Sequence, residues 1–157
     1  MSDADHADHD PRSRRVPLRG RAQGGEVTWR ATIYGKMASG KDNRVTVQGG
    51  VVRRYPLPRM KEWKEAVWAQ LIPLRPKEPM DGPLGLSMIF YLPKNSGYRV
   101  RDPWPCHKPD VFDNLAGPIA DCLEAVGVVK NDSRFCQVET KKVFGEPMRV
   151  EIKVWEL

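Results

Sequence analysis

Three aspartates around a short periodic apolar segment constrain this chain more than any other part of its sequence. Asp110 and Asp113 lie three residues apart, and Asp132 follows the apolar segment 119–129. Hard cations such as Mg²⁺ take oxygen ligands in proteins, commonly one or two carboxylates completed by waters and substrate phosphates. The pattern therefore predicts a small metal site. The alternative is an ordinary helix cap followed by a turn, because Asp, Asn and Ser are also preferred there.

The residues between these carboxylates have the periodicity of a buried helix. Apolar side chains recur there at spacings of 3, 4 and 7, namely Leu115, Ile119, Cys122, Leu123 and Val126. Asp113 is placed to be the N-cap residue, and Gly127 to end the helix. Pro118 does not fit the fifth position of a helix that begins at Asp113. Either the first turn is irregular, or the regular helix begins at Gly117 with Pro118 at its first position.

Alternating apolar and polar residues predict strands on both sides of this segment. The strand at 84–92 is largely apolar on both faces, which is typical of a central strand. The last two strands, joined by the turn at 145–147, are expected to form a C-terminal β-hairpin. The full set of expected strands is 27–34, a short strand at 44–47, 84–92, 135–144 and 149–155.

A second helix is expected at 59–71, where Met60, Trp63, Val67, Trp68 and Leu71 recur at helical spacing. Its tryptophans are candidates for base stacking, but at this spacing a place in the core is favoured. The whole pattern predicts an α+β fold with a single domain at 26–157. A mixed sheet of four to five strands packs against two main helices. Residues 1–25 contain few large apolar groups and are expected to be a disordered tail, acidic at first and then basic.

The composition indicates the class of partner. The chain has 157 residues, a net charge of +6 and a pI near 9.4, which favours a polyanion such as nucleic acid. An apolar run long enough for a membrane span is lacking, so no membrane contact is expected. Three cysteines without paired or zinc-like spacing indicate reduced thiols, and the polar N-terminus lacks a secretory signal. We therefore expect a cytoplasmic protein.

Basic residues gather in three places, one of them just after the first strand. The loop after 84–92 has basic and aromatic residues interleaved, which is typical either of a surface that faces DNA or of a solvated loop. The third place, late in strand 135–144, could bind phosphate. The glycines near Lys41 lack the spacing of a phosphate-binding loop, so no nucleotide cofactor is expected. The candidate DNA-binding residues are Lys36, Lys41, Arg44, Lys94, Arg99, Arg101, Lys141 and Lys142.

The sequence resembles the RusA-like Holliday junction resolvases over about residues 105–152. The segment Pro109-Asp110-Val111-Phe112-Asp113-Asn114-Leu115 is similar to the Pro-Asp-x-Asp-Asn-Leu motif of that family. Asp121 and Leu123 then match an Asp-x-Leu motif, Asn131-Asp132 matches an acidic turn, and the similarity continues through Gln137-Val138 and Lys141-Lys142.

The resemblance implies a small α+β, homodimeric, Mg²⁺-dependent endodeoxyribonuclease of a bacterial or phage-infected cell, with Mn²⁺ as a substitute ion. It implies paired symmetric cuts in branched DNA during recombination and repair. The catalytic and metal-binding carboxylates would be Asp110, Asp113 and Asp132. Asn114 would be a supporting residue beside them. Because this chain lacks the usual Lys of the family, Lys108, Lys130 or Lys141 could supply the supporting cation. Family members have a similar basic loop after their first strand, which implies that Lys36, Lys41 and Arg44 face DNA.

The chain departs from the family pattern at two positions. Two residues, Val111 and Phe112, separate the first two aspartates where the common pattern has one. The usual Lys three residues after the Asn is Gly117. The alternatives are therefore a catalytically inactive module that binds branched DNA, and a structural oligomer whose fold a metal stabilises.

Overall fold

The structure, a computed structural model, describes residues 28–37, 43–56, 58–94 and 102–157. The expected tail at 1–25 lies outside the described residues. In chain order the elements are β1 (Thr28–Tyr34), β2 (Asn43–Gln48), β3 (Val51–Pro56), α1 (Pro58–Leu71), η1 (Ile72–Leu74), β4 (Leu84–Leu92), η2 (Phe112–Ala116), α2 (Gly117–Ala125), η3 (Asp132–Arg134), β5 (Phe135–Phe144) and β6 (Arg149–Glu156). These elements confirm the predicted α+β class.

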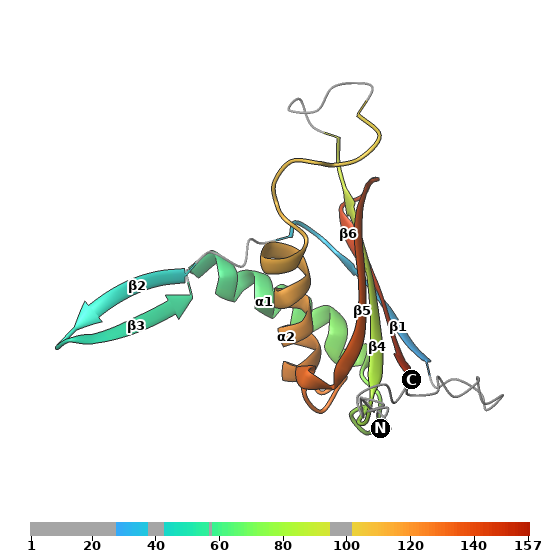
Figure 1. The fold of residues 1–157 in the computed structure, drawn as a ribbon, viewed down its shortest axis with the longest axis horizontal. Helices are drawn as coiled ribbons and strands as arrows, with labels where there is room; N and C mark the ends of the chain where they lie inside the picture. The colour runs from blue at the N-terminus through green and yellow to red at the C-terminus, as the bar shows by residue number, and fades with distance from the viewer. Residues whose placement is uncertain (1–27, 38–42, 57, 95–101) are drawn as a thin grey trace, which may run out of the picture.

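The main sheet is mixed and has the strand order β1-β6-β4-β5. β4 is an inner strand, as predicted, and it pairs antiparallel with β6 and parallel with β5. The two C-terminal strands follow one another along the chain, with β4 lying between them in the sheet. Because β4 and β5 point the same way, the chain must cross back between them, and α2 makes this crossover. α2 therefore runs opposite to both strands, as Figure 1 shows.

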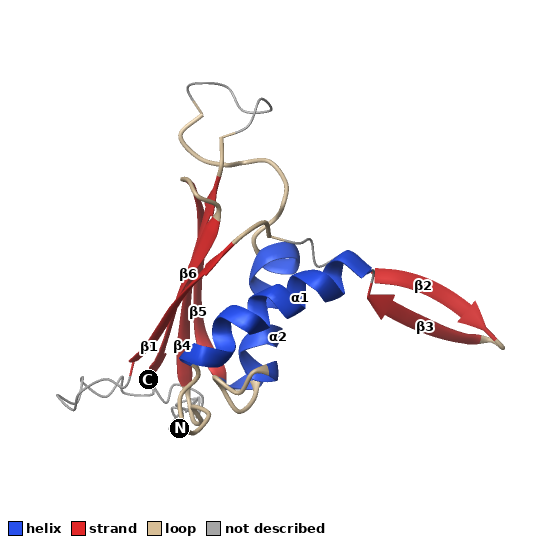
Figure 2. Cartoon of the chain, turned by 180° about the vertical axis from the view of Figure 1, so that it is seen from behind, coloured by secondary structure: helices blue, strands red, loops and turns tan. Residues whose placement is uncertain are grey.

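Both helices cover one face of the sheet (Figures 1 and 2). Helix α1 buries Met60, Val67 and Leu71, and Trp63 and Trp68 pack against the same core. The core interpretation of these tryptophans is therefore confirmed. The sheet contributes alternate residues of its inner strands, and α2 contributes Ile119, Cys122 and Leu123. Within the described ranges, no helix is long and apolar enough to cross a membrane.

β2 and β3 form a separate hairpin that projects from the domain (Figures 1 and 2). Gly49 and Gly50 connect them with φ angles of +58° and +77°, and consecutive positive φ angles are typical of type I′ hairpin turns. The sequence analysis predicted the first of these strands but missed β3. Its residues Val51-Val52-Arg53-Arg54 do not alternate in polarity, because the projecting hairpin has no buried face to impose that pattern.

The start of the second helix corrects one expectation. Asp113 is not the N-cap residue, because η2 is a π-helical turn whose N-cap is Val111. The regular helix α2 begins at Gly117 with Pro118 at its start, which confirms the second of the two alternatives. Gly127 ends it, as predicted, with φ +78° and an N–H that donates to Glu124 O at 2.9 Å.

The sheet face opposite the helices is held partly by Trp155 of β6. A Cβ atom added to Gly85 of β4 would lie 2.2 Å from the Trp155 ring, so the ring lies directly on the glycine. We predict that Gly85→Ala lowers the free energy of unfolding by about 1–3 kcal/mol, because the ring must leave its place. Urea denaturation measures this. The same substitution in a Trp155→Ala background should cost little, and an equal cost there would contradict the explanation.

The three cysteines are free, and burial raises the pKa of Cys122 to about 11. Cys106 and Cys136 are exposed. Since the thiolate is the reactive form, we predict that a thiol reagent at pH 8 modifies two thiols of the native protein quickly. Cys122 should react only on unfolding. Mass spectrometry of the partly modified protein checks this, and fast labelling of Cys122 would show that the core around α2 opens easily.

Candidate active site

The carboxylate of Asp110 lies exposed in the loop before η2, and Asn114 holds it. The backbone N–H of Asn114 donates to Asp110 Oδ1 at 3.3 Å, and its side-chain amide donates to Oδ2. Asn114 is 6% exposed and is the one buried polar residue among the described residues. A buried amide thus fixes the direction of an exposed carboxylate. The supporting role of Asn114 in the active site stays a prediction.

The loop around Asp110 is also held from the sheet by Lys142 of β5. Lys142 Nζ donates to the carbonyl of His107 at 2.7 Å and to that of Pro109 at 2.9 Å. Lys142 was predicted to bind DNA, and in the structure its ammonium group supports the acidic loop. Lys108, between the two carbonyls, is exposed.

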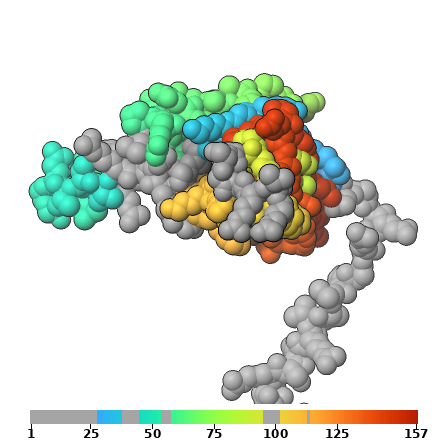
Figure 3. All heavy atoms as spheres, turned by 90° about the horizontal axis from the view of Figure 1, so that it is seen from above, coloured from blue at the N-terminus to red at the C-terminus, as the bar shows by residue number. Residues whose placement is uncertain are grey.

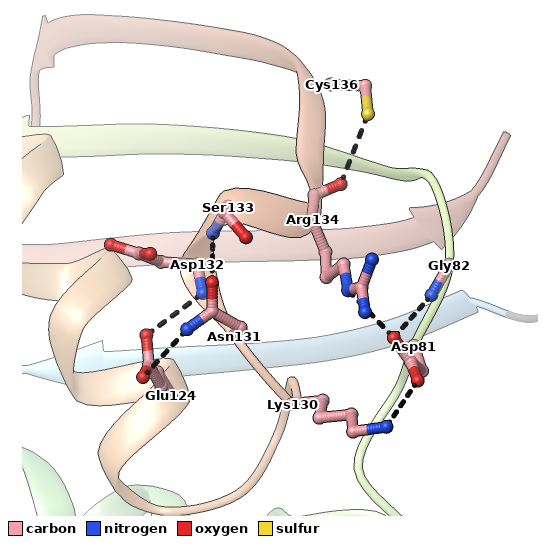
Figure 4. A network of polar contacts seen from close by, with 9 residues as sticks. All are labelled: Asp81, Gly82, Glu124, Lys130, Asn131, Asp132, Ser133, Arg134 and Cys136. Atoms are coloured by element: carbon pink, nitrogen blue, oxygen red, sulfur yellow. Dashed lines mark hydrogen bonds and ion pairs between the residues drawn. The ribbon is translucent and has the colours of Figure 1, made fainter.

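Asp132 lies at the other end of α2, in a turn that Glu124 organises (Figure 4). The carboxylate of Glu124 accepts the N–H of Asp132 at 3.0 Å and the side-chain amide of Asn131 at 3.2 Å. Asn131 Oδ1 accepts the N–H of Ser133 at 3.0 Å and caps η3. Three hydrogen bonds therefore fix this short turn, and the side chain of Asp132 remains exposed.

The same turn is anchored to the connector before β4 through Asp81 (Figure 4). Lys130 Nζ lies 2.9 Å from one oxygen of Asp81, and Arg134 Nε lies 2.8 Å from the other. The hydrogen bond from Lys130, followed by that from the N–H of Gly82, holds the pKa of Asp81 below its usual value. Lys130, predicted as a supporting residue, makes its contact here. The sequence analysis missed Asp81 and Glu124, because neither belongs to a local motif with Asp132.

The two predicted carboxylates whose side chains the structure describes, Asp110 and Asp132, do not lie together in one chain. Asp110 is tied to Asn114 and Asp132 to Glu124, and ten helical residues between these partners span roughly 15 Å. Within the described part of the chain, no three His, Cys, Asp or Glu side chains form a group that could hold a metal ion. The side chain of Asp113 lies outside the described atoms.

The predicted cations are partly described. Lys36, Lys94 and Lys141 are exposed, and Lys94 Nζ donates to the carbonyl of Asp102 at 3.2 Å. The backbone of Arg44 lies in β2, and its side chain is outside the described atoms. Lys41, Arg99 and Arg101 also lie outside the described residues.

Four strands and the acidic loop meet at one end of the sheet, where β1, β4 and β5 end and β6 starts. Tyr91 of β4 pairs with Val143 of β5 and with Arg149 of β6, and Arg149 also pairs with Tyr34 of β1. Lys36 follows the end of β1 and Lys94 follows the end of β4. Lys142 of β5 connects the acidic loop to the sheet through the carbonyl of His107. Figure 3 shows this end, with the gold segment after residue 101 beside the strands. Lys36, Lys94, Lys141 and Lys142 therefore lie at the Asp110 end of α2.

Comparison with known proteins gives the chain its family. The model of the family "Endodeoxyribonuclease RusA" matches residues 35–155. The crossover junction endodeoxyribonuclease rusA of Lactococcus phage r1t is 33% identical over 91 residues, which are 57% of this chain and 68% of the phage protein. The Bacillus subtilis protein YqaN is 26% identical over 136 residues, which are 80% of this chain and 94% of YqaN. The match includes both ends of α2 and the strands beside it, so this chain belongs to the RusA endodeoxyribonuclease family.

Proposed function

We propose that this endodeoxyribonuclease resolves four-way DNA junctions by paired symmetric phosphodiester cuts that require Mg²⁺. The observation that carries the proposal is the exposed Asp110 carboxylate, which the buried Asn114 and the Lys142-supported loop hold in place. It lies within the segment matched to the RusA family, and the relative from Lactococcus phage r1t is named as a crossover junction endodeoxyribonuclease.

Two chains are needed to complete each site. Asp110 and Asp132 lie at opposite ends of one α2, so no single metal ion can contact both in the same chain. Two copies related by a two-fold axis with their α2 helices antiparallel would bring the Asp110 end of one beside the Asp132 end of the other. Such a homodimer has two equivalent composite sites. Two sites related by that axis also suit two symmetric cuts.

The donor atoms at the two ends of α2 fit a hard divalent cation. Both ends offer exposed carboxylate oxygens, which Mg²⁺ prefers, and each is held by groups that leave its oxygens accessible. Asp110 and Asp113 of one chain with Asp132 of its partner would hold the ion. When bound, the ion supplies polarisation of the phosphoryl oxygen and a more acidic water. The protein's own part is to fix these carboxylates, through Asn114 at one end and Glu124 at the other.

The lysines at the Asp110 end of α2 are proposed to bind the DNA backbone. Lys36, Lys94 and Lys141 follow or end neighbouring strands, so they offer positive charge around the acidic loop. Contacts to phosphates position a nucleic acid without specifying bases. The shape of the branch, rather than base sequence, should therefore dominate recognition.

We predict that the wild-type protein makes paired cuts in a labelled four-way junction with Mg²⁺, and none in a matched linear duplex. EDTA and Asp132→Asn should each abolish cutting while gel-shift binding of the junction persists, because the lysines remain. The control is Glu65→Gln, an exposed carboxylate on α1 whose change should leave cutting intact.

Tight binding without cutting under any divalent ion would instead favour the inactive DNA-binding module. Gly117 is the position that suggests this alternative. It has room for a side chain, since an added Cβ meets nothing closer than Phe112 O at 3.5 Å. In that case Gly117→Lys should restore cutting.

The composite sites give a second prediction. Asp110→Asn and Asp132→Asn chains should each be inactive, but mixed and allowed to exchange subunits they should recover junction nicking. In the heterodimer, one site carries both substitutions and the other carries none. The readout is single-strand nicking by the mixture against each variant alone. Sites built within one chain would stay inactive in every mixture, and that result would refute the two-chain arrangement.

A further inference from the structure

Phe112 is exposed although its sequence position suggests burial. In a regular helix it would continue the apolar stripe of α2, because Leu115, Ala116 and Ile119 follow it at spacings of 3, 4 and 7. Those three side chains are buried. Phe112 is 78% exposed, the highest value among the large apolar side chains that the structure describes as exposed.

The π-helical turn explains this exposure. The N–H groups of Ala116 and Gly117 donate to the carbonyls of Val111 and Phe112, five residues earlier. Such a turn takes up one residue more than an α-helical turn, and each residue of an α-helix rotates the direction of its side chain by roughly 100°. The extra residue between Asp110 and Asp113 is thus absorbed before Asn114. The buried stripe keeps its register, and Phe112 is turned out of it.

Packing does not account for a phenylalanine at this place. An exposed aromatic ring gives up the favourable free energy of burial, and a polar residue would fit the same turn. π-helical turns within helices frequently lie at functional sites, and this one begins two residues after the Asp110 carboxylate. A second aromatic side chain, Trp104, precedes Asp110 in the same segment and is 59% exposed.

We propose that Phe112 stacks on a nucleobase beside the phosphate that is cut, and so determines selectivity for branched DNA. This inference rests on the proposed function. Bases at a branch point lose a stacking neighbour, and an aromatic ring replaces it without regard to base identity. The Cα atoms of Phe112 and Asp110 are two peptide units apart, at most about 7.6 Å. A strand whose phosphate lies at Asp110 therefore has its adjacent base within reach of the ring.

A second copy of this chain is a less suitable partner for the ring. A stable chain-to-chain interface buries about 800 Å² on each side, and one phenylalanine supplies a small part of that area. The ring also stands between two aspartates in the sequence, where an apolar interface would have to bury charge. A nucleobase presents a flat face that one ring can cover, while its phosphate stays near the lysines.

The test uses a four-way junction with 2-aminopurine at the branch, bound in EDTA so that no cutting occurs. Stacking is worth a factor of about 5 to 100 in binding per base. Binding of the wild-type protein should change the fluorescence of 2-aminopurine, because the base stacks on the ring. Phe112→Leu should weaken junction binding by that factor and remove this fluorescence change. Phe112→Trp should keep the wild-type affinity and the fluorescence change. Ile72→Ala is the control, since it removes an exposed apolar side chain of η1 that belongs to neither acidic segment. Thermal melts should show that all the variants are folded.

Two results would overturn the proposal. The first is that Phe112→Leu binds the junction with the affinity of the wild type and gives the same change in 2-aminopurine fluorescence. The other is loss of the dimer in sedimentation by this variant, which would place the ring in the chain-to-chain interface. If wild-type protein binds the junction but never cuts it with Mg²⁺, the proposed function fails. The stacking comparison is still decided, because it is measured without cutting.

Discussion

The parallel pairing of β4 with β5 determines where every candidate site residue lies. Parallel neighbours require a crossover, and here the crossover is the long loop followed by α2. The loop begins where β4 ends, so Asp110 is placed at that end of the sheet. α2 then carries the chain back, and Asp132 is placed where β5 starts. The separation of these two carboxylates is thus a consequence of strand direction, and it is the basis of the proposal that two chains complete each site.

At both ends of α2 the segments that carry the aspartates are held in place, while the aspartates remain exposed. Asn114 and Lys142 hold the Asp110 loop, and Glu124 and Asp81 hold the turn of Asp132. Full burial would make each charged form costly and favour protonation. Here the contacts are made to the backbone of both segments and, at Asp110, also to the carboxylate. They hold the segments without burying the aspartates, so the cost of burial does not arise. Asp110 and Asp132 therefore both remain exposed.

The sequence predicted those elements whose pattern is imposed by burial. The strand at 84–92 is largely apolar on both faces because it lies inside the sheet, and the helix at 59–71 repeats apolar residues along its buried face. Both were found close to their bounds. β3 was missed because the projecting hairpin buries no face. Asp110, Asn114 and Asp132 were selected from a motif. Glu124 and Asp81 were missed, because their partners lie seven or more residues away and no periodicity links them.

The extra residue before Asp113 shows where such a chain can accept an insertion. Within α2 one added residue would rotate every later side chain by roughly 100° and move the buried stripe away from the sheet. At the first turn, two i→i+5 hydrogen bonds absorb it. Asn114, Leu115, Ala116 and Ile119 are buried, whereas Phe112 is exposed. The turn that adjoins the candidate site is therefore the part of the helix that can gain a new side chain without loss of the core.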